Sequence, residues 1–161
     1  MESGKTKVDI LQDLIRMQRN IRKGVEAQER FIRGFQLLVQ REGLSAQAID
    51  HLPFPVAIFE QNGVVRMANG ILMKQAKIET NELSQGKVNL LDRVTNENYA
   101  VFAAVEDTFC GNITMARDLL FPLTLFRRDT SGEGSDPYHT AAFFPVSCSG
   151  SIRYGSVMLM K

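Results

Sequence analysis

The stretch Leu52-Pro-Phe-Pro-Val-Ala-Ile-Phe-Glu-Gln-Asn-Gly-Val-Val-Arg-Met-Ala-Asn69 decides the fold more than any other part of the chain. Its two prolines disfavour a helix at the start. The runs at 56–60 and 64–68 are rich in the apolar and β-branched residues that strands prefer. Between them, Asn62-Gly63 is the signal of a tight turn, because glycine adopts a positive φ without steric cost. Asn69 is placed to cap a following helix. The stretch therefore predicts a β-hairpin that leads into a helix.

The rest of the chain after the hairpin predicts short helices, one longer helix and three strands. The last two strands are expected to form a second hairpin, with its turn at 149–151. In chain order we expect a helix at 70–77, a polar connection at 79–87, short helical material at 90–94, a helix from 95 or 96 to 109, and strands at 113–126, 138–147 and 152–160, with a polar loop at 127–137.

The N-terminal segment 8–42 contains no proline and predicts one long amphipathic helix that ends at Gly43. Its apolar residues recur in alternating steps of three and four, which is the period of a seam between two helices. Gly24 and Gly34 weaken the helix, so it needs a partner surface. One interpretation is that it packs on its own domain, and the other is that it forms a coiled-coil-like dimer helix. The predicted dimer residues are Leu11, Leu14, Ile21, Val25, Ile32, Phe35 and Val39.

Composition limits the class of protein. The net charge of +1 gives no electrostatic reason for direct binding of nucleic acid. The two cysteines lack paired spacing and lie apart from the two histidines, so we expect free thiols in a reducing cytoplasmic compartment and no metal site. No window approaches the roughly 20 apolar residues of a membrane span. Phosphate-loop, nucleophile and zinc-hydrolase motifs are absent from the sequence, so we expect no enzymatic activity.

The order of the expected elements, together with the opening stretch, resembles the PAS family. In that family a proline-containing apolar strand, a turn with glycine and a second strand ending in asparagine form the first hairpin. Residues 52–69 are similar to this pattern, except that Glu60 stands where aspartate is commoner. The resemblance implies an α+β fold, a five-stranded antiparallel sheet with helices on one face, preceded here by the long amphipathic helix. We expect a helix unit at 1–44 and a PAS-like domain at 45–161.

The PAS resemblance implies a regulatory sensor and dimerisation module of a signal-transduction protein. No output domain follows the last strand, so we expect a fragment of a histidine kinase of a two-component system, a response regulator or a transcription regulator. Its expected partners are a second copy of the chain and a small molecule. The alternative is a ligand-free PAS domain that serves only homodimerisation or partner docking.

PAS domains often hold a small molecule between the sheet and the long helix, but the cofactor here is unknown. Flavin photochemistry in this family needs a cysteine early in the helical region, whereas Cys110 lies at the far end and is expected to be a buried thiol. Haem needs an axial ligand, and the helix at 96–109 has no histidine. Flavin and haem are therefore disfavoured. The predicted ligand-binding residues, whose apolar members have the simpler interpretation of core, are Phe102, Phe109, Arg117, Leu120 and Phe144.

Overall fold

The computed structural model describes residues 6–127, 137–148 and 151–161. The chain divides into two compact units, Met1–Leu37 and Leu38–Lys161, which we call the helix unit and the domain unit. The division at residue 44 that the sequence favours stays a prediction.

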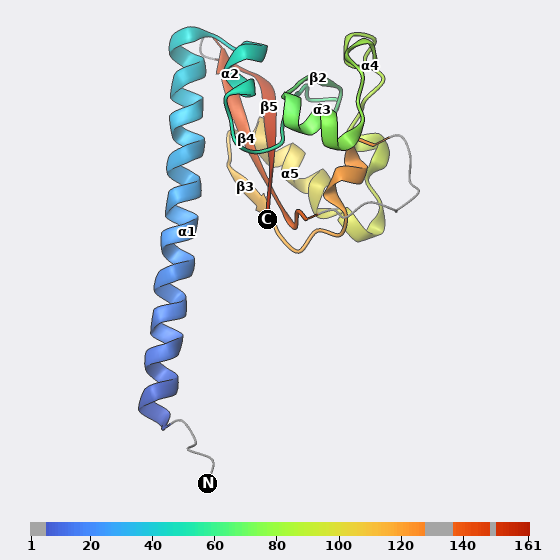
Figure 1. Cartoon of the computed structure of the whole chain (residues 1–161). Helices are drawn as coiled ribbons and strands as arrows, with labels where there is room; N and C mark the ends of the chain where they lie inside the picture. Colours follow the sequence, from blue (N-terminus) through green and yellow to red (C-terminus); the bar gives the residue numbers. More distant parts are fainter. Residues whose placement is uncertain (1–5, 128–136, 149–150) are drawn as a thin grey trace. The chain divides into compact units, whose positions relative to one another are not determined.

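The first element is the helix α1, which spans Lys7–Glu42 (Figure 1). Thr6 precedes it and exchanges hydrogen bonds with Asp9, so the first turn of the helix is capped. At the other end Gly43 adopts a φ of 84° and donates its N–H to the carbonyl of Val39 at 2.8 Å. The predicted long helix and its glycine stop are confirmed.

The first turn of α1 is expected to lose stability in acid through Asp9. The backbone N–H and the hydroxyl of Thr6 donate to the Asp9 carboxylate at 3.1 and 2.8 Å, and these hydrogen bonds hold the pKa of that carboxyl below its usual value. A pKa that is lowered by folding gives stability above the unfolded pKa, and this stability is lost as pH falls through the folded pKa. An NMR titration of the Asp9 carboxyl in Thr6→Val should give a higher pKa than in the wild type. Equal pKa values in both proteins would contradict the cap.

Five strands of the domain unit form one antiparallel sheet in the order β2-β1-β5-β4-β3 (Figure 1). The longest strand, β5, pairs with β1 on one side and with β4 on the other, so it lies at the centre of the sheet. The bounds of the strands are Val56–Phe59 for β1, Val65–Ala68 for β2, Thr114–Ala116 for β3, Thr140–Cys148 for β4 and Ser151–Met160 for β5. The predicted five-stranded antiparallel sheet is confirmed.

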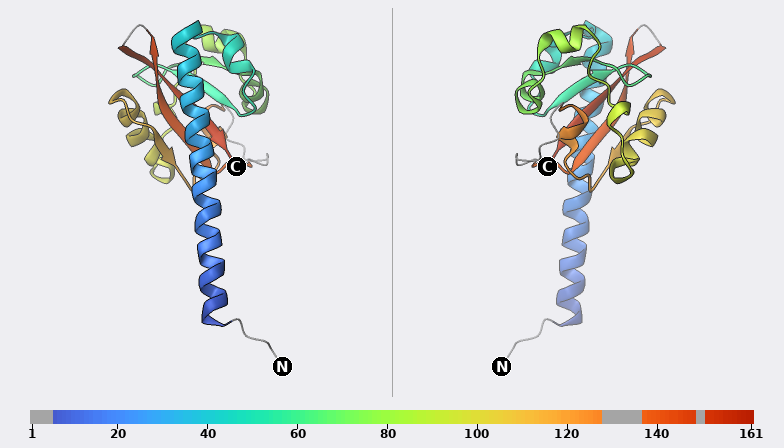
Figure 2. Two further views of the ribbon diagram at one scale, coloured as in Figure 1. Left: turned by 90° about the vertical axis from the view of Figure 1, so that its left-hand side faces the viewer. Right: turned by 90° about the vertical axis from the view of Figure 1, so that its right-hand side faces the viewer.

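The helices between β2 and β3 lie on one side of the sheet (Figure 2). They are α3 at Gly70–Ala76, α4 at Thr80–Ser84 and α5 at Ala100–Phe109, with single 3-10 turns η1 at Leu91–Arg93 and η2 at Asn96–Asn98. A short helix, α2 at Ala46–Asp50, precedes β1 and is capped by the Ser45 side chain. The predicted α+β class with helices on one face is confirmed. The segment 79–87, predicted to be a polar connection, contains the helix α4, in which Leu83 is the one buried residue.

The main core lies between the sheet and these helices, and its strand residues alternate as a pleated sheet requires. Phe59 of β1 and Phe143 of β4 point to the helix side and belong to this core. Their rings meet edge to face with centroids 6.2 Å apart, and Phe59 meets Phe109 of α5 in the same way at 6.0 Å. This aromatic cluster joins the two layers of the domain.

The predicted third strand at 113–126 is wrong beyond its first residues. The strand β3 ends at Ala116 because Asp118 and Phe121 adopt left-handed φ angles of 55° and 51°, which no strand tolerates. Pro122 then opens the 3-10 helix η3 at Pro122–Leu125. Four apolar residues of this segment are buried although they do not lie in a strand, namely Leu119, Leu123, Leu125 and Phe126. Apart from their end residues, the predicted loop at 127–137 and the turn at 149–151 lie outside the described residues.

Candidate functional site

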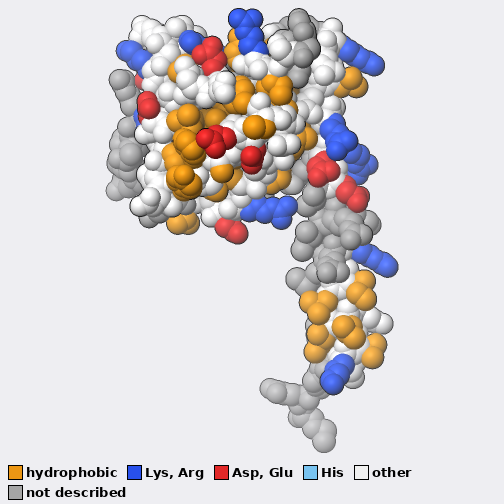
Figure 3. Space-filling view, turned by 180° about the vertical axis from the view of Figure 1, so that it is seen from behind, with side chains coloured by type: hydrophobic (Ala, Val, Ile, Leu, Met, Phe, Trp, Pro, Cys, Tyr) orange, Lys and Arg blue, Asp and Glu red, His pale blue; other side chains and the backbone are white. Residues whose placement is uncertain are grey.

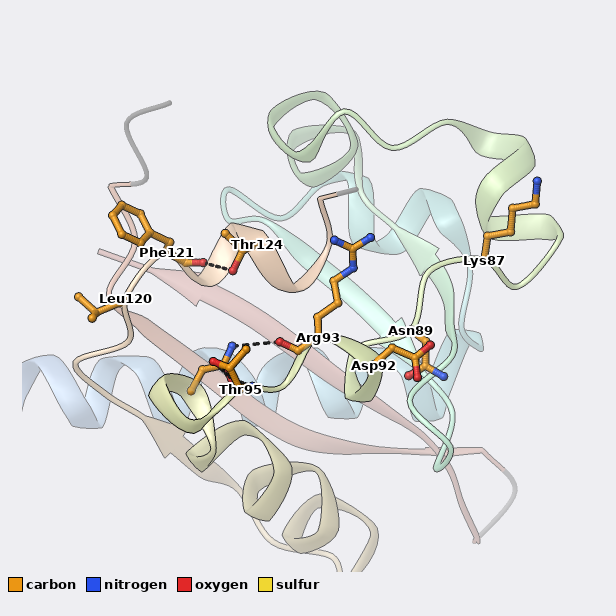
Figure 4. A pocket seen from close by; sticks show the side chains of 9 residues that line it. Lys87, Asn89, Asp92, Arg93, Thr95, Leu120, Phe121 and Thr124 are labelled. Atoms are coloured by element: carbon orange, nitrogen blue, oxygen red, sulfur yellow. Dashed lines mark hydrogen bonds between the residues drawn. The ribbon is translucent and has the colours of Figure 1, made fainter. Parts of the chain in front are cut away.

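A cleft of about 570 Å³ opens at the end of the domain where the η1–η2 segment faces the loop before η3 (Figure 4). Its two walls are far apart in sequence and are brought together by the fold. The residues that line it are Lys87, Asn89, Asp92, Arg93, Thr95, Asn98, Leu120, Phe121 and Thr124.

Two asparagines that line the cleft, Asn89 and Asn98, hydrogen-bond to the backbone around it. The buried side chain of Asn98 accepts from the N–H of Thr95 and donates to the carbonyl of Arg93 at 3.4 Å. Asn89 accepts from the N–H of Leu91 at 2.9 Å and donates to the carbonyl of Asn62 at 3.2 Å. These bonds fix the backbone of the η1–η2 segment, so the charged side chains that it carries start from a defined position.

Two cations, Lys87 and Arg93, line the cleft. Neither Lys87 nor Arg93 has an ion-pair or side-chain hydrogen-bond partner among the residues that the structure describes. Figure 4 shows the Arg93 side chain extending into the middle of the opening, with Lys87 at one end. The side chain of Asp92 points in a different direction from that of Arg93 and lies beside Asn89 (Figure 4). The cationic part of the cleft is therefore open to an anion.

The other end of the cleft is apolar. Leu120 and Phe121 are 60% and 56% exposed, which is unusual for neighbouring large apolar side chains. The left-handed backbone of Phe121 is held because its carbonyl accepts from both the N–H and the hydroxyl of Thr124, at 2.9 and 2.7 Å. Such a conformation costs about 1–2 kcal/mol for a residue other than glycine. The fold therefore holds an aromatic ring at the surface at some cost.

The predicted ligand-binding residues do not meet in one cavity. Phe109 packs on the core, whereas Phe144 follows Phe143 in β4 and so points to the opposite face of the sheet. Phe102 is 36% exposed and stacks on Tyr99 with ring centroids 5.8 Å apart. Arg117 is exposed. Of the five, Leu120 alone lines the cleft, and the ligand-binding role of the others stays a prediction.

The interface between the sheet and α5 is tightly packed at Gly155. A Cβ atom on Gly155 would lie 2.6 Å from the Phe59 ring and 2.9 Å from Cγ2 of Thr108. The sheet and α5 are therefore in close contact at Gly155. Sequence reasoning missed the surface cleft because Lys87 and Arg93 follow no periodic pattern.

The predicted dimer residues of α1 fall into groups. Leu11 and Leu14 are 58% and 52% exposed. Ile32, Phe35 and Val39 are buried. The side chains of Ile21 and Val25 lie outside the described residues. The role of these residues in a dimer stays a prediction.

Other site classes find little support in the described parts of the chain. No group of three or more His, Cys, Asp or Glu side chains there could hold a metal ion. Among the described helices, none combines the length and the apolar character that a membrane crossing needs. Cys110, expected to be buried, is exposed because it follows the last turn of α5.

No protein-family model matches the chain, and no curated protein matches it. Among solved structures, a sensory box sensor histidine kinase from Vibrio cholerae is similar, with 13% identity and a TM-score of 0.46 over 86% of this chain and 94% of that one. The PAS domain of BvgS from Bordetella pertussis has 13% identity and a TM-score of 0.40 over 72% and 80%. A LOV protein from Rhodobacter sphaeroides has 12% identity and a TM-score of 0.47 over 71% and 62%. The PAS-like fold rests on the elements and the sheet of this chain.

Proposed function

We propose that the chain is a non-enzymatic regulatory module of a signal-transduction protein, which pairs with a second copy through α1 and senses a small ligand or a partner. The observation that carries the proposal is the apolar surface on the N-terminal part of α1. The proposed setting is a cytoplasmic histidine kinase of a two-component system, a response regulator or a transcription regulator.

The apolar surface of α1 consists of large side chains that are between 47% and 61% exposed, and Figure 3 shows them gathered on the N-terminal part of the helix. We call it the α1 stripe, and its residues are Val8, Ile10, Leu11, Leu14 and Ile15. A contiguous apolar surface of this kind on a single helix marks an interaction site. The 3.5-residue spacing of its seam residues favours a second helix of the same kind, because two such helices interlock knob into hole.

The end of α1 is tied to the fold of the domain. Residues of α1 from Leu38 onward belong to the domain unit. The next helix, α2, is bonded to the start of α3, because Asp50 accepts from the N–H of Gly70 at 2.9 Å and the carbonyl of Ile49 accepts from the Asn69 amide at 3.2 Å. A change in the packing of α3 therefore has a short route to α1, which supports a role in transmitting a signal.

A second candidate function is a ligand-free PAS-like domain that serves only homodimerisation or partner docking. The close approach of Phe59 and Thr108 to Gly155 favours it, because it leaves no room for a ligand beside Gly155. The two candidates share the dimer and differ in the cleft.

The double variant Leu11→Glu/Leu14→Glu is expected to weaken the dimer by about ten-thousandfold or more, because each buried leucine contributes about 1.5–3 kcal/mol and each dimer loses four. Size-exclusion chromatography with light scattering would measure the change. The matched control is Leu37→Glu, the same substitution at a leucine of α1 that is 47% exposed and outside the seam. A double variant that stays as dimeric as the control would refute the proposal.

A further inference from the structure

We propose that the surface cleft binds a small organic anion with an apolar body. Its anionic oxygens would contact Arg93, with Lys87 adding positive charge at the far end of the cleft, and its apolar part would lie against Leu120 and Phe121. This inference rests on the proposed sensing function and names the ligand class that the module would sense.

The charge of the cleft selects an anion. Among the residues that the structure describes, Lys87, Asp92 and Arg93 are the charged side chains that line the cleft, and together they are net positive. Arg93 is only partly exposed and extends into the opening without a partner among the described residues, whereas most surface arginines are fully hydrated. A guanidinium group in this state offers paired N–H donors that match the two oxygens of a carboxylate or a phosphate. Asp92 disfavours an anion beside Asn89, so the headgroup is expected at Arg93, on the side toward Leu120 and Phe121.

The apolar end selects the body of the ligand. Leu120 and Phe121 stand opposite the cationic end, as Figure 4 shows, so the polarity of the cleft changes along its length. An inorganic anion would leave this end in contact with water, and a purely apolar molecule would leave two cations without a partner. A molecule with an anionic group and an apolar body would contact both ends of the cleft. The volume of about 570 Å³ lies within the range of roughly 300–1,000 Å³ that is usual for small-molecule sites.

The strained backbone of Phe121 also supports a ligand site at this end of the cleft. The exposed ring of Phe121 has two energetic costs. The left-handed backbone is strained, and the apolar ring is in contact with water. The hydrogen bonds from Thr124 to the Phe121 carbonyl hold the backbone in this conformation. Strained residues of this kind concentrate at ligand-binding sites.

The test uses the full chain labelled with nitrogen-15 and four probes, which are phenylacetate, phenyl phosphate, 2-phenylethanol and inorganic phosphate. Phenylacetate or phenyl phosphate is expected to shift the backbone amide signals of Thr95, Leu120 and Thr124 in a saturable way. The stronger of the two identifies the headgroup. The neutral alcohol and inorganic phosphate are each expected to bind about tenfold or more weakly, because each lacks one of the two parts.

Two variants locate the contacts. Arg93→Gln removes the charge and keeps much of the length of the side chain. Phe121→Asn removes the ring while keeping a residue that tolerates a positive φ, so the loop should stay folded. Each is expected to weaken binding of the aromatic anion about tenfold. The matched control is Arg117→Gln, at an exposed arginine outside the cleft, which should leave binding unchanged.

The proposal is overturned if no probe produces saturable shifts at these amides up to millimolar concentrations. It is also overturned if 2-phenylethanol binds as well as the anions, or if inorganic phosphate binds as well as they do and Phe121→Asn changes nothing. The proposed function is tested by a different result. If the molar mass of the same samples is that of a monomer, the dimerisation module is refuted. A dimer that binds no probe would refute the ligand class and leave the dimerisation module standing.

Discussion

Replacement of Asn69 by alanine is expected to lower the free energy of unfolding of the domain by about 4 kcal/mol, because four buried hydrogen bonds to the backbone are lost at once. The Asn69 side chain is 1% exposed. Its Oδ1 accepts from the N–H groups of Val56 at 3.0 Å and Leu72 at 3.2 Å. Its Nδ2 donates to the carbonyls of Ile49 at 3.2 Å and Phe54 at 2.6 Å. One side chain thereby joins α2, the proline stretch, β1 and α3.

Equilibrium urea unfolding of Asn69→Ala would measure this loss. The matched control is Asn112→Ala, at an exposed asparagine, which should change the free energy of unfolding by less than about 0.5 kcal/mol. Asn69→Asp keeps the two acceptor bonds but turns a carboxylate oxygen toward two carbonyls, so it should be destabilising as well. If Asn69→Ala behaved like the control, the central role of Asn69 would be refuted.

Replacement of Gly155 by alanine is expected to cost about 3 kcal/mol, because the added methyl group has no room. A Cβ atom there would lie 2.6 and 2.8 Å from atoms of the Phe59 ring and 2.9 Å from the Thr108 side chain. The ring cannot withdraw easily, since Phe109 and Phe143 pack edge to face against it. The strand must shift or the aromatic cluster must rearrange.

The matched control for this substitution is Gly34→Ala, where nothing lies within 4 Å of the added Cβ atom. Because Gly34 lies inside α1, alanine there should stabilise the helix by up to about 1 kcal/mol. The partner variant Phe59→Leu should make Gly155→Ala less costly in a double-mutant cycle, since the smaller side chain leaves space. Additive effects of the two substitutions would contradict the proposed clash.

The sequence predicted those features of the fold that depend on local chemistry. Asn69 was recognisable as a helix cap from its position between an apolar strand and a helical pattern, and Gly43 as a helix stop. The bonds from Asn69 to Ile49 and Phe54 were not predictable, because they join segments that only the tertiary fold brings together. Local signals therefore identified the residue but only part of its role.

The errors have a common physical cause. The apolar residues around Leu119 and Leu123 suggest a buried strand, but periodicity cannot distinguish a strand from irregular backbone that is equally buried. The cleft escaped prediction for a related reason, since its cations and its exposed ring come from segments separated by the whole of α5.

The most direct test of the proposed function is sedimentation equilibrium of the full wild-type chain over a range of concentrations. Pairing through the α1 stripe predicts a molar mass of twice the 18.1 kDa of the chain at micromolar concentrations. It also predicts a return to the mass of one chain in Leu11→Glu/Leu14→Glu at the same concentrations. A wild-type chain that sediments as a monomer up to hundreds of micromolar would contradict the dimerisation module.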